Sequence, residues 1–171
     1  MESIKILLAA DHPLVRSSLE TLLQCFEGLD IVGEAENGQE TVEKTGELSP
    51  DVAIIDSSMP KLSGIEATKI ITKEFPNTRV LALCMHGDEE HVIQVLRCGA
   101  SGYIVKSSAR EELIEAIRAV AKGWDFRSSK FSGRVLETIS PHPASARIRL
   151  TASRFRSPSG KGKFSDSSRK D

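Results

Sequence analysis

Four short apolar segments of this chain each lead into a residue whose side chain can do chemistry. In chain order these residues are Asp11, Asp56, Cys84 and Lys106. Short, nearly continuous runs of Val, Ile, Leu and Ala are typical of parallel strands that are buried on both faces. The carboxyl ends of such strands meet at one rim of an open α/β sheet, where ligands bind. Two carboxylates, a lysine and a small polar side chain at that rim would suit a phosphoryl group and a divalent cation.

Helical patterns separate the apolar segments and predict five strand-then-helix units over residues 1–122. Pro13 suits the first position of the first helix, where a missing N–H has no consequence. Gly99 and Gly123 stand where the fourth and fifth helices should end. Three pairs have the spacing of a capping box, namely Asn37 with Glu40, Ser63 with Glu66, and Ser108 with Glu111. The alternation predicts a doubly wound α/β fold, with a parallel sheet and helices on both faces.

Two details refine this prediction. The second strand, residues 31–35, contains Gly33 and Glu34, so we expect it at an edge of the sheet. In the first helix, an apolar stripe is predicted to face the core. Its members are Leu14, Leu19, Leu22 and Leu23.

The distribution of charge divides the chain in two. Residues 1–126 hold 12 Lys and Arg against 21 Asp and Glu, whereas residues 127–171 hold 11 against 3. An acidic globular domain with a basic tail is the expected organisation. We predict a domain over residues 1–122, a linker with a short helix at residues 123–140, and a disordered Ser- and Arg-rich tail at residues 141–171.

The three cysteines form no Cys-x-x-Cys pair and no metal-binding cluster with the histidines. Reduced thiols in a cytoplasmic protein are the expected state. The first residues are not a basic leader, and the apolar run after them has only seven residues, so neither a signal peptide nor a membrane span is predicted.

Three segments together resemble a response-regulator receiver domain, most closely that of the NarL/FixJ (LuxR-type) transcription factors. The segments are residues 7–16 (LLAADHPLVR), 51–64 (DVAIIDSSMPKLSG) and 80–106 (VLALCMHGDEEHVIQVLRCGASGYIVK). The resemblance covers nearly all of residues 1–122 in the right order and spacing. It implies a flavodoxin-like five-stranded parallel sheet with strand order 2-1-3-4-5.

The resemblance also implies a two-component signalling function. Asp56 would accept a phosphoryl group from the phosphohistidine of a sensor histidine kinase, and Lys106 would neutralise the phosphoryl oxygens. Asp11, Asp56 and the backbone carbonyl of Ser58 would hold Mg²⁺. Such a domain is not an enzyme, beyond self-catalysed phosphorylation and dephosphorylation. Its other expected partner is a second copy, through a face made by the fourth helix, the fifth strand and the fifth helix.

Two positions depart from the pattern of the family. Ala10 stands where a second acid is usual, and Cys84 where a Ser or Thr hydroxyl normally bonds the phosphoryl group. A thiol is a weak donor, and a buried cysteine more often packs as a small hydrophobe than senses redox state. For Tyr103 two roles stay open: it suits the aromatic switch position of the family, and it suits a half-buried packing position equally well. The alternative function is therefore a pseudo-receiver, which binds proteins without being phosphorylated.

The tail lacks the apolar period of a helix-turn-helix, so a complete DNA-binding output domain is not predicted. A natural single-domain regulator, a truncated relative and a reading-frame change remain three explanations. DNA binding would need a supplied output domain, and the basic tail offers only weak contact with nucleic acid.

Two enzyme classes of similar fold are excluded. A flavodoxin needs a hydroxyl-rich loop where Asp11 stands, and a haloacid-dehalogenase phosphatase needs an aspartate at Ser58.

Overall fold

The computed structural model describes residues 3–57, 59, 61–84, 89–106, 110–127 and 148–150. The strands are β1 (Ile4–Ala9), β2 (Leu29–Ala35), β3 (Val52–Asp56), β4 (Arg79–Cys84), β5 (Gly102–Val105), β6 (Asp125–Arg127) and β7 (Ile148–Leu150). The helices are α1 (Pro13–Gln24), α2 (Gly38–Leu48), α3 (Gly64–Glu74), α4 (Glu89–Arg97) and α5 (Arg110–Ala121). No helix within these residues has the length and apolarity that a membrane span requires.

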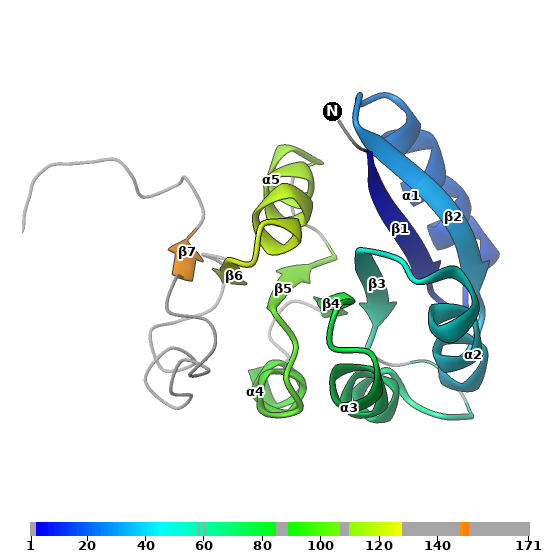
Figure 1. Ribbon diagram of the computed structural model, residues 1–171, viewed down its shortest axis with the longest axis vertical. Helices are drawn as coiled ribbons and strands as arrows, with labels where there is room; N and C mark the ends of the chain where they lie inside the picture. Colours follow the sequence, from blue (N-terminus) through cyan, green and yellow to red (C-terminus); the bar gives the residue numbers. More distant parts are fainter. Residues whose placement is uncertain are drawn as a thin grey trace, which may run out of the picture.

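The described strands form one parallel sheet in the order β2-β1-β3-β4-β5-β6-β7 (Figure 1). The predicted order of the first five strands is confirmed, and β2 lies at an edge as expected. Two short strands that were not predicted continue the sheet beyond β5. The second of them, β7, falls within the segment predicted to be disordered. The rest of residues 128–171, including the expected helix near residues 135–139, lies outside the described residues, so the predicted division into domains stays a prediction.

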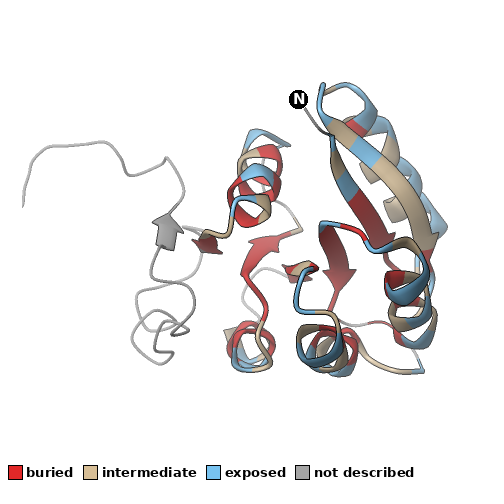
Figure 2. Ribbon diagram, viewed as in Figure 1, coloured by how far each residue is buried: buried red, intermediate tan, exposed pale blue. Residues whose placement is uncertain are grey.

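Helices cover both faces of the sheet, as the alternating pattern predicts. On one face α2, α3 and α4 pack on a core that includes Ile55, Val80, Ile71 and Val92. On the other face α1 and α5 pack on the remaining strand side chains, such as Ile54. Figure 2 shows β3, β4 and β5 almost wholly buried, the edge strand β2 mostly half-buried, and the helices buried only on the sides that meet the sheet. The sheet is thus the rigid layer that fixes the strand ends relative to one another.

The helix ends follow the local chemistry of the sequence. The capping box of α3 is complete, since Glu66 N donates to Ser63 Oγ and Ser63 N donates to a Glu66 carboxylate oxygen. At α2 the Asn37 side chain accepts from Glu40 N, but the Glu40 carboxylate accepts from Glu36 N instead of Asn37 N. The third expected box depends on Ser108, which lies outside the described residues.

Both glycine stops and most of the leucine stripe are confirmed. Gly99 and Gly123 have φ of 106° and 91°, the left-handed conformation that ends a helix. Leu14 was wrongly included in the stripe, because its side chain is 78% exposed. At about 100° per residue it lies half a turn around α1 from the buried Leu23.

Candidate functional site

Asp56 and Lys106 meet at the carboxyl rim of the sheet. Asp56 is the last residue of β3, and Lys106 follows the last residue of β5, on the far side of β4. The Lys106 Nζ lies 2.7 Å from Asp56 Oδ2. The Asp56 side chain is 1% exposed and that of Lys106 is 25% exposed. Two residues that are 50 positions apart in the chain are therefore paired, as the strand-end prediction expected.

The strand register places Lys106 two residues beyond the level of Asp56, because Leu83, the partner of Asp56, pairs with Ile104. Asp56 lies beside Leu83 of β4, and Cys84 lies beside Val105 of β5. Beyond the strands, Ser57 N donates to Leu83 O at 3.1 Å, and Lys106 N donates to Cys84 O at 2.8 Å. The backbone on each side of the ion pair is thus hydrogen-bonded to β4.

This pair sets the electrostatics of the rim. A buried carboxylate is strongly destabilising unless a cation or hydrogen-bond donors compensate it, and the Lys106 ammonium supplies that compensation. The ammonium stays partly exposed, so it is accessible to a ligand that approaches from solvent. A carboxylate beside a partly exposed cation can act as a nucleophile toward a group that carries negative oxygens, because the cation offsets their charge.

Asp11 stands next to this pair in the sheet order. Ala9, two residues before it, is the register partner of Ile55, which precedes Asp56. Asp11 itself is partly exposed, whereas Ala10 is 1% exposed. The third expected metal ligand, the carbonyl of Ser58, lies outside the described residues.

The residues at the rim fit a magnesium ion. Within the described part of the chain, no three His, Cys, Asp or Glu side chains gather as a metal cluster. A site for Zn²⁺ or another metal that takes several protein ligands is therefore not formed there. Mg²⁺ binds through one or two carboxylates and keeps several waters, and the adjacent strand ends offer the carboxylates of Asp11 and Asp56.

Cys84 and Tyr103 are both buried on the same side of the sheet. They are 0% and 1% exposed, and both belong to the core that packs under α3 and α4. Tyr103 lies beside Ala82 in the register, one pair before Cys84 and Val105. The packing interpretation of Tyr103 and the hydrophobe interpretation of Cys84 agree with these positions.

Arg16 belongs to the rim although the sequence did not single it out. Its Nη1 donates to Ala10 O at 2.5 Å, and its Nε lies 3.2 Å from Glu34 Oε1. The arginine side chain is only 13% exposed. The sole sequence signal is its spacing, one helical turn after His12 and five residues after Asp11.

Gly64 is a second contributor that was missed. A β-carbon at this position would lie 2.1 Å from Asp56 O and 2.7 Å from the Ser57 Cα. The first residue of α3 therefore rests directly on the backbone of Asp56, and only glycine allows that approach.

Two side chains away from the ion pair have shifted pKa values. The hydrogen bond from the backbone of Glu36, with help from Lys44, lowers the pKa of Glu40 in spite of its partial burial. Burial raises the pKa of the Cys98 thiol, and Lys69 opposes the shift. Neither group belongs to the rim, so neither changes the chemistry proposed for it.

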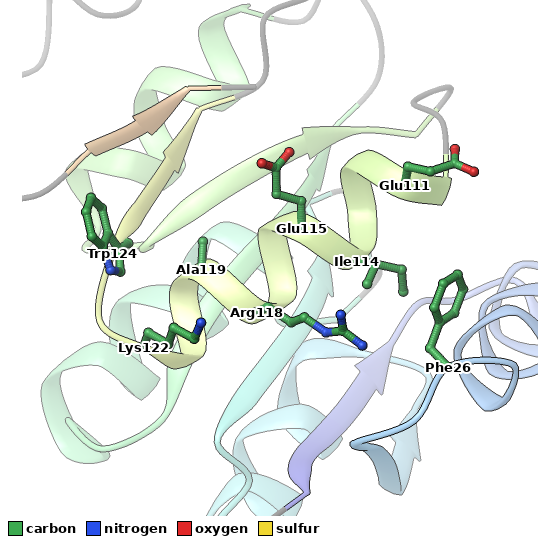
Figure 3. A pocket seen from close by; sticks show the side chains of 8 residues that line it. All are labelled: Phe26, Glu111, Ile114, Glu115, Arg118, Ala119, Lys122 and Trp124. Atoms are coloured by element: carbon green, nitrogen blue, oxygen red, sulfur yellow. The ribbon is translucent and has the colours of Figure 1, made fainter. Parts of the chain in front are cut away.

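A groove of about 640 Å³ runs along α5 and is separate from the rim (Figure 3). Its lining includes Phe26, Ile114, Arg118, Lys122 and Trp124. In Figure 3 Phe26 approaches α5 from the end of α1, on the side of Ile114 and Arg118. Asp11, Asp56 and Lys106 take no part in the lining, so the groove is not an extension of the candidate site.

Comparison with known families gives the context of this rim. Residues 6–118 match the model of the response regulator receiver domain. The chain belongs to this family. Receiver domains of response regulators are not classical enzymes, generally bind Mg²⁺ and interact with histidine kinases.

The curated relatives of this receiver include transcriptional regulatory proteins. The chain is 35% identical over 134 residues to the transcriptional regulatory protein DegU of Brevibacillus brevis, with 78% of this chain and 57% of DegU covered. It is 38% identical over 136 residues to LiaR of Bacillus subtilis, with 80% and 64% covered. It is 42% identical over 130 residues to the oxygen regulatory protein NreC of Staphylococcus epidermidis, with 75% and 60% covered. The chain thus spans less than two thirds of the length of these relatives.

Solved receiver structures have the same fold. The signal receiver domain of the response regulator NarL from Mycobacterium tuberculosis superposes with a TM-score of 0.69 at 32% identity, covering 72% of this chain and 99% of that one. The isolated receiver domain of RcsB from Salmonella enterica, determined with the phosphomimetic BeF₃⁻, gives 0.70 at 28% identity, covering 78% and 99%. The assignment of the chain as a NarL-type receiver agrees with both.

Proposed function

We propose that Asp56 of this receiver accepts a phosphoryl group from the phosphohistidine of a sensor histidine kinase. The observation that carries the proposal is the buried Asp56 carboxylate paired at 2.7 Å with the partly exposed Lys106 ammonium. A carboxylate is a poor nucleophile toward phosphorus because the phosphoryl oxygens repel it, so the site must neutralise charge. Lys106 meets that need, because its ammonium can follow the incoming oxygens.

The transfer is a displacement at phosphorus. An Asp56 carboxylate oxygen forms the new P–O bond, the P–N bond to the donor histidine breaks, and the released imidazole nitrogen keeps the electron pair and takes a proton. The product is an acyl phosphate on Asp56. Water later attacks phosphorus, and hydrolysis returns the carboxylate and inorganic phosphate.

Asp11 and Asp56, with the carbonyl of Ser58, are the groups proposed to hold Mg²⁺ at this rim. When bound, the ion neutralises phosphoryl oxygens and orients the group for in-line attack. Ala10 contributes no charge to the site, so we expect Mg²⁺ to bind several-fold more weakly than where an acid occupies that position.

The proposed output is a changed contact face rather than a chemical product. Lys106 directly follows β5, so movement of its side chain toward a phosphoryl group would alter the contacts of β5 with α4 and α5. A homodimer through this face is part of the proposal. DegU and LiaR are named as transcriptional regulatory proteins, and one RcsB structure contains dimers bound to DNA. For this chain, DNA binding is proposed only through a supplied output domain.

A cytoplasmic location accords with three cysteines that form no disulfide.

A pseudo-receiver is the second candidate function. It is favoured by Ala10 and by the fully buried Cys84, whose thiol replaces the hydroxyl expected at the end of β4. In that case the same face would bind a partner without phosphorylation.

Intact-mass measurement separates the two functions. The full chain is incubated with acetyl phosphate and Mg²⁺, beside Asp56→Asn and Asp51→Asn variants. Asp51 is the matched control, because it is an acid at the opposite end of the same strand and accepts from Lys5 N. We expect the wild type and Asp51→Asn to gain one labile phosphoryl group and Asp56→Asn to gain none. An unchanged mass in the wild type, with no spectral change on addition of beryllofluoride, would favour the pseudo-receiver instead.

A further inference from the structure

Arg16 makes one contact with the residue before Asp11 and a second with a carboxylate of β2. Arg16 Nη1 donates to Ala10 O at 2.5 Å, and Arg16 Nε lies 3.2 Å from Glu34 Oε1. The guanidinium thus connects α1 to the end of β1 and to β2. The backbone of Arg16 belongs to the first turn of α1, where Arg16 N donates to His12 O at 3.1 Å.

Ala10 is held from both sides. Its N–H donates to Ala35 O at 3.0 Å, and its carbonyl accepts from Arg16. The side chain is a methyl group that is 1% exposed, so all polar contacts at this residue are made by the backbone. Because a peptide unit is planar, the Ala10 carbonyl oxygen lies in the same plane as the nitrogen and Cα of Asp11. Fixing that oxygen therefore fixes the atom from which the Asp11 side chain starts.

The sign of the charge makes this arrangement informative. Arg16 is a nearly buried cation that contacts the residue next to Asp11, the carboxylate proposed to bind Mg²⁺. Coulomb repulsion between the guanidinium and Mg²⁺ would by itself weaken that binding. Glu34 compensates the guanidinium and is itself tied to α2, because Lys44 Nζ donates to the Glu34 carbonyl. The charge of Arg16 is thus compensated by Glu34, while its hydrogen bond holds the carbonyl of Ala10.

We propose that Arg16, neutralised by Glu34, is a positioning residue that orients Asp11 for Mg²⁺ binding. The inference rests on the proposed function of the rim. Arg16 touches neither the metal nor the phosphoryl group and acts through the Ala10–Asp11 peptide. Its loss raises the Mg²⁺ concentration needed for half-maximal phosphorylation and leaves the rate at saturating Mg²⁺ close to that of the wild type.

The test uses full-length Arg16→Gln and Glu34→Gln variants with Arg118→Gln as the matched control. Arg118 also donates to a backbone carbonyl, that of Glu27 at 3.2 Å. Glu27 comes just before β2 and so lies at the opposite rim of the sheet. Mg²⁺ affinity is measured without any phosphodonor, from the amide NMR shifts of Ala10 and Asp11 and from thermal stabilisation by Mg²⁺.

We expect the Mg²⁺ dissociation constant to rise roughly tenfold in Arg16→Gln, by a smaller factor in Glu34→Gln, and not at all in Arg118→Gln. A simple electrostatic effect has the opposite sign, because removing a positive charge would tighten Mg²⁺ binding. A purely structural role would lower the melting temperature of Arg16→Gln while leaving its Mg²⁺ affinity unchanged. Either of those results overturns the positioning role.

Mg²⁺ binding and phosphorylation of the wild type show whether the role of Arg16 or the proposed function of the rim has failed. If the wild type gains a phosphoryl group and Arg16→Gln binds Mg²⁺ equally well or more tightly, the positioning role alone fails. If the wild type neither binds Mg²⁺ nor gains a phosphoryl group, the proposed function fails, and the role of Arg16 fails with it.

Discussion

At the scale of single residues, the proposed chemistry of this receiver depends on one buried carboxylate and its lysine partner. Asp56 is shielded by the surrounding strands, and the ammonium of Lys106 compensates its charge. This burial makes the pair costly to break. The Lys106 side chain is more exposed than that of Asp56, so in the proposed function the lysine can move toward a ligand while the carboxylate stays in place.

Replacing Lys106 with methionine should therefore destabilise the protein. The change leaves the Asp56 charge buried without its ammonium partner, and we expect the free energy of unfolding to fall by roughly 3 kcal/mol, since the exposed part of Lys106 moderates the loss. Urea denaturation at neutral pH measures it. In the Lys106→Met, Asp56→Asn double variant most of this loss should be recovered, because the buried charge is gone. Equal losses in the single and double variants would contradict a coupled pair.

The sequence predicted the members of this pair but not all of their supports. Asp56 and Lys106 could be placed at one rim because strand ends in a parallel sheet must converge. Arg16 could not be assigned a role, since its contacts with Ala10 and Glu34 depend on the spacing between α1 and two strands. Ser58, expected from the resemblance as a metal ligand, stays a prediction.

At the scale of elements, the connection from β3 to α3 supports the backbone of Asp56, the proposed phosphoacceptor. The capping box at Ser63 starts α3, and Gly64 then packs on the backbone of Asp56. The capping box was predictable, because it is a local pattern of two side chains three residues apart. The close approach at Gly64 was not, because it arises only when α3 folds back over the end of β3.

A Gly64→Ala change should disturb both stability and the site. Its β-carbon would meet backbone atoms of Asp56 and Ser57, which cannot rotate away as a side chain could. We expect a loss of roughly 2–3 kcal/mol of unfolding free energy and slower phosphorylation by acetyl phosphate. Gly46→Ala is the control: the β-carbon there would lie 3.2 Å from the edge of the Phe75 ring, and alanine favours the helix. If the two variants phosphorylated at the same rate, α3 would have no part in placing Asp56.

At the scale of the whole molecule, the order of the five main strands followed from the sequence, whereas the far edge of the sheet did not. A three-residue strand such as β6 is too short for any hydrophobic period to show. It nevertheless contributes to the core, because Phe126 is 0% exposed and packs with Ile104 and Ile117 between β5 and α5. Its backbone N–H donates to Ser101 O at 3.0 Å, and Gly102 lies against its carbonyl.

The core of the receiver is therefore expected to depend on residues beyond the predicted domain end at 122. Phe126→Ala removes a fully buried ring from the layer beneath α5, and we expect a loss of about 3–5 kcal/mol in unfolding free energy. Phe26→Ala is the control, since that ring is only partly buried and lines the groove along α5. Its loss should be clearly smaller. Thermal and urea unfolding of both variants, together with chains ending at residues 122 and 127, would measure the dependence. Equal stability of these two shortened chains would show that β6 adds nothing to the folded unit, and that the boundary predicted from the sequence holds.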